Sequence, residues 1–250
     1  MTVLVKRGRA LIMLAGALLL LPTERAWAQS VDGGVEAASD EVRAGISWSG
    51  ARASVSADGR LDLGPLDASV RVAALRGAAR HGGADAVADV AAGRDWALGA
   101  VTLRTEVVGH LFAGAAQRMD FAELVLGARY GLGPLRVAAT AWFAPRQSTI
   151  GGDNLHLRVG ADAGLPGLPL TVLASVGYST GSGSDPRAAR LRPGGDYADW
   201  KLGAEYTRWP LTFGLDYVGN SIAPERIRVT PFADAGGVRD RVVARVRLAF

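Results

Sequence analysis

The last ten residues, Arg241–Phe250, place side chains of opposite character on the two faces of an extended strand. Successive side chains of a strand point to opposite faces, so alternate residues share an environment. One face of this segment is apolar and ends in an aromatic ring, whereas the other face carries three arginines. This pattern is typical of a barrel whose outside contacts lipid and whose inside is wet. The apolar face consists of Val242, Ala244, Val246, Leu248 and Phe250, and the arginines are Arg241, Arg245 and Arg247.

The first 28 residues have the pattern of a secretory signal peptide. Three basic residues precede the apolar run Leu11–Leu21, and Ala26-Trp27-Ala28 is a small-x-small cleavage site. The apolar run is too short to span a membrane as a helix, and no later segment is apolar over a sufficient length. We therefore expect residues 1–28 to be removed, and any membrane-spanning part to consist of β-strands.

The charge of the mature chain is close to balanced. The 250 residues carry a formal net charge of +4. The predicted signal peptide holds four basic residues and one acid, so its removal leaves 24 basic and 23 acidic residues. This balance gives no support to a nucleic-acid partner. The absence of cysteine excludes a disulfide scaffold and a thiolate metal site.

Residues 41–250 contain about twelve segments with the period-two alternation of strands, beginning with Val42–Ser49. A polar, flexible lead-in at residues 29–40 precedes them. Short turns alternate with longer loops, as in single-chain outer-membrane barrels with periplasmic turns and extracellular loops. We therefore predict an all-β chain whose residues 41–250 form one antiparallel transmembrane β-barrel of about 12 strands. The predicted short turns lie at Gly64, Arg94, Gly131, Pro166 and Trp209.

Aromatic residues gather near the ends of the predicted strands, as expected for girdles at two membrane interfaces. A soluble all-β sandwich is the alternative fold. The girdle near the short turns would contain Trp96, Tyr130, Tyr206, Trp209 and Phe250, and the other girdle Trp48, Phe112, Trp142, Phe143, Tyr178, Trp200 and Tyr217.

Three segments, Arg43–Ser47, Asp196–Gly203 and Asp240–Phe250, resemble the TorF-type porin family of proteobacteria, a family of largely unassigned role. The resemblance implies a bacterial outer-membrane barrel and carries over no catalytic residue. We accordingly expect the bacterial cell outer membrane as the location, with its bilayer lipids as partners. The barrel-assembly machinery is a further expected partner, through the C-terminal strand that ends at Phe250.

The predicted inward face carries charges of both signs. Eight-stranded barrels are filled by their own side chains, whereas barrels of 16–18 strands leave a channel, so about twelve strands allow a narrow pore. Inward Gly, Ala and Ser leave space and favour passive diffusion of small hydrophilic solutes. The alternative is a closed structural or adhesive barrel in which these charges pair with one another. The candidate pore-lining residues are Arg71, Arg104, Glu106, Glu123, Asp162, Glu205, Asp216 and Arg245.

The three histidines, His81, His110 and His156, fall near loops or upper strand ends. A hydrolase at the barrel rim would need a histidine beside a serine or a carboxylate, and His156 near Asp153 or His110 could supply one. Solvated loop histidines are the commoner case, so we predict no enzyme. No pair of ligands has the spacing of a metal site, and we predict no metal and no cofactor.

Overall fold

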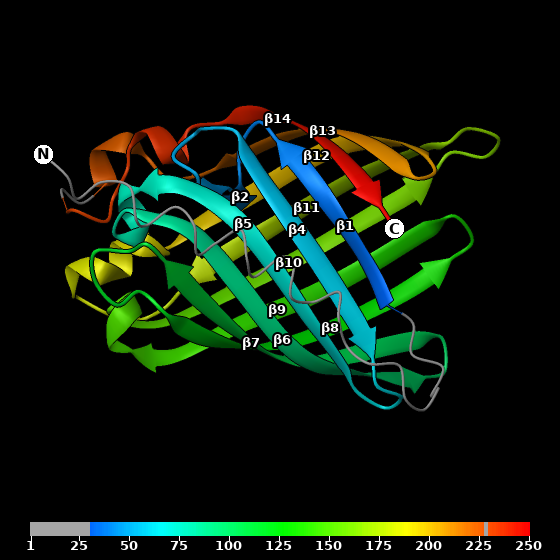
Figure 1. Ribbon diagram of the computed structural model, residues 1–250, viewed down its shortest axis with the longest axis horizontal. Coiled ribbons are helices and arrows are strands. Elements are labelled where there is room, and N and C mark those ends of the chain that lie inside the picture. Colours follow the sequence, from blue (N-terminus) through cyan, green and yellow to red (C-terminus); the bar gives the residue numbers. More distant parts are fainter. Residues whose placement is uncertain (1–30, 228–229) are drawn as a thin grey trace, which may run out of the picture.

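The computed structural model describes residues 31–227 and 230–250, so the predicted signal peptide lies outside the described residues. The described chain forms one closed barrel of twelve antiparallel strands (Figure 1). This result confirms the predicted all-β barrel and its strand number. The barrel strands are β1 (Val31–Ala38), β4 (Ser54–Asp62), β5 (Asp67–Ala78), β6 (Ala84–Leu98), β7 (Val101–Ala113), β8 (Phe121–Leu132), β9 (Leu135–Gln147), β10 (Gly152–Gly164), β11 (Leu170–Thr180), β12 (Tyr197–Arg208), β13 (Leu211–Asn220) and β14 (Arg241–Ala249).

The first and last strands close the barrel. β1 pairs with β14 from Gly34 opposite Ala249 to Ala38 opposite Arg245. On its other side, β1 pairs with β4 along its whole length. Closure leaves the sheet without an edge, so the wall has no row of unpaired backbone groups.

The start of the barrel differs from the prediction. Residues 31–38, expected in a flexible lead-in, form β1, so the barrel begins ten residues earlier than expected. The predicted first strand, Val42–Ser49, is wrong because the chain reverses within it. β2 (Val42–Arg43) and β3 (Ile46–Ser47) form a small hairpin outside the barrel sheet. Its two central residues, Ala44 and Gly45, have φ angles of 47° and 69°, as a tight type I′ turn requires.

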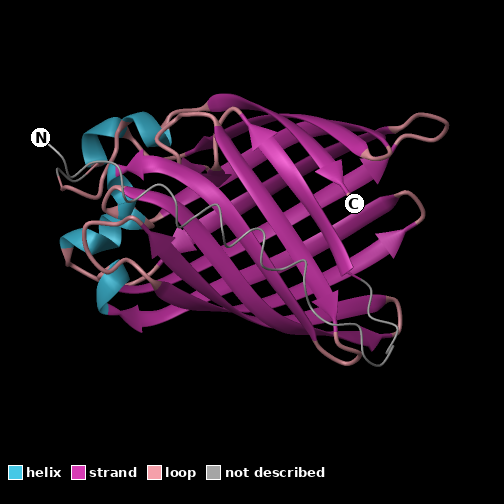
Figure 2. Ribbon diagram, viewed as in Figure 1, coloured by secondary structure: helices cyan, strands magenta, loops and turns pink. Residues whose placement is uncertain are grey.

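The connections have different lengths at the two ends of the barrel. Short turns lie at one end, which we call the turn end, and longer connections with five 3-10 helices lie at the loop end (Figure 2). The turn predicted at Arg94 is wrong, because β6 continues to Leu98 and the reversal occurs at Gly99, with a φ of 63°. The 3-10 helices of the described residues are η2 (Ala79–His81), η3 (Ser148–Ile150), η4 (Pro186–Arg190), η5 (Pro224–Arg226) and η6 (Gly236–Val238).

In the described part of the chain, no helix has the length and apolar character needed to cross a membrane.

The outer face of the barrel is apolar. The predicted outward residues Val242, Val246, Leu248 and Phe250 are exposed, and exposed Leu, Val and aromatic residues occur on every barrel strand. The aromatic residues predicted at the turn end are exposed. At the loop end, Phe143, Tyr178 and Tyr217 are exposed, but Trp48, Phe112 and Trp142 pack inside the barrel. Phe112 and Trp142 alternate with the outward residues Leu111 and Phe143, so the strand geometry directs them inward.

The apolar outer face predicts that a charged side chain lowers stability more at the middle of a strand than near its end. Leu211 and Leu215 lie on the same face of β13, at its turn-end terminus and near its middle. We expect Leu215→Arg to lower the free energy of unfolding in lipid vesicles by about 2–4 kcal/mol, and Leu211→Arg by about 0–1 kcal/mol. Urea titrations read by heat-modifiable gel mobility measure both values. Equal costs for the two variants would contradict a hydrocarbon environment around mid-strand.

Candidate functional site in the barrel lumen

Residues 39–53, which we call the lumen segment, leave the wall after β1 and fold into the barrel before β4 begins. The β2–β3 turn is anchored by two buried side chains of the wall. Tyr197 Oη donates to the carbonyl oxygen of Ala44 at 3.0 Å, and Asn220 Nδ2 donates to that of Gly45 at 2.8 Å. Ile46 packs with Tyr197, Ile222 and Val238 in a buried apolar cluster. The segment is therefore part of the packed interior.

Two carboxylates fix the start of the lumen segment. Asp40 accepts hydrogen bonds from Ser47 and Ser49, both at 2.7 Å, and forms an ion pair with Arg241 of β14. Glu41 receives two hydrogen bonds from the Arg71 guanidinium, at 2.7 and 2.8 Å. Bidentate, charge-assisted pairs of this kind hold both partners in a defined geometry. These pairs attach the segment to β14 and β5, which lie on either side of β1 and β4 in the closed sheet.

A chain of alternating charges continues from the lumen segment across the wall. Arg43 pairs with Asp89 of β6 at 2.8 Å, and Asp89 contacts His110 Nδ1 of β7 at 2.7 Å. The other ring nitrogen of His110, Nε2, lies 3.2 Å from Glu123 of β8. This arrangement links the segment by polar contacts to three neighbouring strands.

The remaining charged candidates form ion pairs within the wall. Arg104 makes a bidentate pair with Asp67 and also contacts Glu106, Arg136 pairs with Asp162 at 2.8 Å, and Arg245 bridges Glu205 and Asp216 at 2.5 and 3.1 Å. All eight predicted lining residues thus have a partner of opposite sign, or, for Glu123, a histidine. Their role in lining a path for solutes stays a prediction.

The inward glycines hold arginine side chains. A Cβ built on Gly93 would lie 2.6 Å from Arg104 Nη2, and one built on Gly214 would lie 2.7 Å from Arg245 Nε. Gly34 accommodates Arg247 in the same way, with 2.6 Å to Nη2. The expectation that inward glycines leave open space is therefore wrong at these positions, because guanidinium groups lie flat across the neighbouring strand.

The loop end is closed by interlocking connections. Arg80 of η2 donates to the carbonyl oxygen of Arg190 at 2.8 Å, and Arg190 of η4 donates to those of Met119 and Thr149 at 2.9 and 2.6 Å. Arg80 is 1% exposed and Arg190 0%. Burial lowers the pKa of Arg80 to about 10 and that of Arg190 to about 9. We call the connections that meet here the cap.

His81 lies at the centre of the cap, completely buried, with its ring 4.4 Å from that of Trp48 and 5.0 Å from that of Phe112. Burial lowers its pKa well below the usual value, and the positive charges of Arg190 and Arg80 lower it further. The neutral ring is therefore the form that fits the closed cap. The aromatic rings tie the lumen segment, through Trp48, to the cap.

The histidines proposed for a rim hydrolase lie inside the barrel. His156 does not contact Asp153, which instead accepts hydrogen bonds from Ser182. His156 Nδ1 lies 2.9 Å from Ser179 Oγ and 3.7 Å from Asp199. Serine and carboxylate approach the same ring nitrogen, so the ring cannot relay a proton between them through its two nitrogens. The predicted pairing of His156 with Asp153 is wrong.

Two cavities occupy the lumen between the cap and the turn end. The loop-side cavity, about 350 Å³, is bordered by the lumen segment and by the inward faces of β6–β12. The turn-side cavity, about 340 Å³, is bordered by residues of β4–β7. Both have Asp89, Glu106 and Val108 in their lining, so the same part of the wall borders the two cavities.

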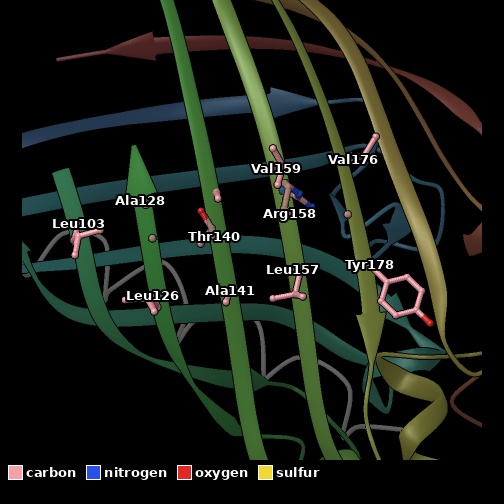
Figure 3. A pocket seen from close by; sticks show the side chains of 13 residues that line it. Leu103, Leu126, Ala128, Thr140, Ala141, Leu157, Arg158, Val159, Val176 and Tyr178 are labelled. Carbon is pink, nitrogen blue, oxygen red and sulfur yellow. The ribbon is translucent and has the colours of Figure 1, made fainter. Parts of the chain in front are cut away.

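A third hollow, about 580 Å³, lies at the outer wall over β7–β11 (Figure 3). The exposed side chains of Leu126, Leu157 and Val176 border it, and small residues such as Ala128 and Ala141 form part of its floor. Large and small side chains alternate here, so the apolar wall is uneven in height. The hollow offers no charged group to a polar ligand, since Arg158 turns inward over the ring of Trp142.

A closed barrel with an apolar outer face and a charged, paired interior defines the class of transmembrane β-barrels of the outer-membrane type. Residues 26–234 match the family model described as bacterial protein of unknown function (Gcw_chp), and the chain belongs to this family. None of the curated proteins compared with the sequence matches it.

The chain is similar to several solved structures at low sequence identity. The KdgM porin is 10% identical, with 88% of this chain and 97% of that chain covered and a TM-score of 0.54. OprD of Pseudomonas aeruginosa is 13% identical, with 91% of this chain and 67% of that chain covered, and the TM-score is 0.44. LpxR from Salmonella typhimurium is 12% identical, with 88% of this chain and 99% of that chain covered, and the TM-score is 0.43. The likeness to the KdgM porin supports the fold alone.

The Glu41–Arg71 pair predicts a large loss of stability when one partner is removed. Arg71→Ala leaves the buried Glu41 without its main counter-charge, and we expect it to lower the free energy of unfolding by about 3–5 kcal/mol. The matched control is Arg136→Ala, because Arg136 is 72% exposed beside Asp162 and its pair contributes about 0–1 kcal/mol. Urea unfolding of the refolded proteins measures both. A cost below that of the control would contradict the anchoring role.

Burial of neutral His81 predicts that acid loosens the cap. Its pKa is lower in the folded state than in the unfolded state, so protonation favours opening, and stability falls as the pH drops below the ordinary histidine pKa of about 6.5. We expect faster amide hydrogen exchange in η2 and η4 at pH 5 than at pH 7.5, after correction for intrinsic rates. His81→Phe keeps the aromatic contacts and should remove this acid dependence. An unchanged dependence in that variant would contradict the assignment.

Proposed function

We propose that this protein is a porin-like barrel of the bacterial outer membrane in which the lumen segment restricts the passage of small hydrophilic solutes. The observation that carries the proposal is the position of residues 39–53 inside the lumen, attached by Asp40 to Arg241 and by Glu41 to Arg71. Solutes pass when these polar attachments release and the segment moves. The resting barrel is closed at the loop end.

The character of the attachments supports a segment that moves. Its ion pairs with the wall are charge-assisted contacts between groups that water solvates well once they separate. Its apolar anchors are few, chiefly Ile46 and Trp48. The backbone of the barrel wall, in contrast, is paired on both sides of every strand. The segment can therefore rearrange while the wall stays intact.

The charges of the lumen form local pairs and do not produce a field across it. Arg71 binds Glu41 of the lumen segment, whereas Arg245 lies beside Glu205 and Asp216 on adjacent strands. Neighbouring opposite charges cancel at a distance. We infer that solute selection depends on size and on short-range hydrogen bonds more than on a long-range field.

The second candidate function is a closed structural or adhesive barrel whose outer loops carry the activity. The observation that favours it is the cap, in which Arg80 and Arg190 are fully buried and bonded to backbone carbonyl oxygens of other connections. In that case the interior pairs only stabilise the barrel, and the lumen segment does not move.

The proposal also covers the export, assembly and location of the protein. Residues 1–28 act as a secretory signal peptide, and the exposed terminal Phe250 after β14 is the signal read by the barrel-assembly machinery. The resemblance to the TorF-type porins supports an outer-membrane location. The interior histidine contacts do not favour a hydrolase, and the protein acts without a cofactor.

Single-channel recording in planar bilayers tests the proposal. Asp40→Asn/Glu41→Gln keeps the shapes of the side chains and removes two charge-assisted attachments of about 1.5–3 kcal/mol each, so we expect at least about a tenfold rise in open probability over the wild type. Asp162→Asn, at an exposed pair, is the matched control and should leave the open probability unchanged. In the opened variant, Arg245→Glu should shift ion selectivity toward cations.

Two outcomes would contradict restriction by the lumen segment. A wild-type channel that stays open with the conductance of the variant would show that the segment does not close the lumen. Silence of the variant, and of a chain in which a Gly-Ser linker replaces residues 41–50, would favour the closed structural barrel.

A further inference from the structure

The loop-side cavity combines an aromatic wall with polar groups that have no partner. Its lining includes Trp142, Asn154, His156 and Arg158, which project from β9 and β10. Trp142 packs on the apolar cluster of Ala91, Val108 and Val125, which fixes the position of its ring. The cavity thus has a rigid apolar surface beside a row of hydrogen-bonding side chains.

Three polar atoms of this row lack a hydrogen-bond partner among residues 31–227 and 230–250. They are Asn154 Oδ1, His156 Nε2 and Arg158 Nε. Asn154 is 6% exposed and His156 is 7% exposed, so bulk water does not cover them. A buried polar group without a partner destabilises a fold, and most such groups in proteins are satisfied. Because all three atoms line one cavity, a molecule bound there can supply the missing partners.

The chemistry of these atoms selects hydroxyl groups. Arg158 Nε is a donor, the amide oxygen of Asn154 is an acceptor, and the free nitrogen of His156 takes either role according to its tautomer. A hydroxyl group both donates and accepts, so several hydroxyl groups on one ring match this mixture. The C–H groups of such a ring pack well against an aromatic side chain such as that of Trp142.

The charges around the cavity argue against an ionic ligand. Arg43 is neutralised by Asp89 and Glu41, Glu106 contacts Arg104, and Arg158 lies 3.6 Å from Asp199. Glu123, the remaining carboxylate of this lining, contacts His110. Each charged side chain that the described residues place in this lining therefore has a close partner. The cavity volume of about 350 Å³ lies at the lower end of small-molecule sites, so it suits one sugar ring.

We propose that the loop-side cavity binds a neutral, polyhydroxylated molecule of monosaccharide size, which lies against Trp142 and is hydrogen-bonded to Asn154 and His156. The turn-side cavity shares the lining residues Asp89, Glu106 and Val108 with this site, which favours entry of the ligand from the turn end. The site names the solute class of the proposed function and rests on that function for its biological role. Binding itself needs no conductance.

Isothermal titration calorimetry of the full refolded barrel tests the site, in a detergent without a sugar headgroup. The probes are the neutral hexoses glucose, galactose and mannose, with glucuronate as the anionic analogue. We expect saturable binding of at least one hexose and at least about tenfold weaker binding of glucuronate. Asn154→Leu and His156→Phe should each weaken hexose binding by about tenfold, which corresponds to about 1.4 kcal/mol.

Thermal unfolding of the empty barrel separates a binding role from a structural one. The amide oxygen of Asn154 has no partner, so Asn154→Leu should leave the unfolding midpoint unchanged or raise it. Asn220→Leu is the matched control, because the Asn220 amide bonds Gly45, Val238 and Ile222. It should lower the midpoint.

Either of two results would overturn the site. In the first, none of the three hexoses binds saturably up to about 50 mM, which corresponds to a binding free energy no more favourable than about −2 kcal/mol. The other is hexose binding that neither Asn154→Leu nor His156→Phe weakens. A failure of binding leaves the conductance experiment unaffected, so the two proposals fail independently.

Discussion

The pairing of β1 with β14 is the constraint on which the rest of the structure depends. A backbone amide or carbonyl group that faces hydrocarbon has no water to bond, so each strand of the wall needs a neighbour on both sides. Val31–Ala38 meets this requirement by bonding β14 on one side and β4 on the other. Closure satisfies the backbone of the wall and leaves the outer side chains free to be apolar.

Closure also creates a confined lumen, where charged side chains must find partners. An unpaired charge in such a space is costly, and removing one partner of a pair is more costly than never having placed either. The wall provides partners for Arg104 and Arg245, but Arg71 takes its partner, Glu41, from the lumen segment. The same electrostatic requirement that stabilises the wall therefore fixes the segment inside it.

The pairing determines how the interior can discriminate between molecules. Guanidinium groups lie over Gly93 and Gly214 beside their carboxylates, so the wall is neutralised locally. Local neutralisation suppresses long-range attraction of ions and leaves contact-range hydrogen bonding as the source of selectivity. Among the described residues, three buried polar atoms without a partner line the loop-side cavity, at Asn154, His156 and Arg158.

The sequence alone determined the barrel, its outer face and its two unequal ends, because the alternation in segments such as Arg241–Phe250 follows from local strand geometry. Only the tertiary structure decided that residues 31–38 form a strand. This polar segment is held in the extended conformation by backbone pairing with β14 and β4. The sequence pattern likewise did not predict that residues 39–53 fold into the barrel. Their local signal was the Ala44-Gly45 turn, but their place depends on Arg71, Tyr197 and Arg241, which are far away in the chain.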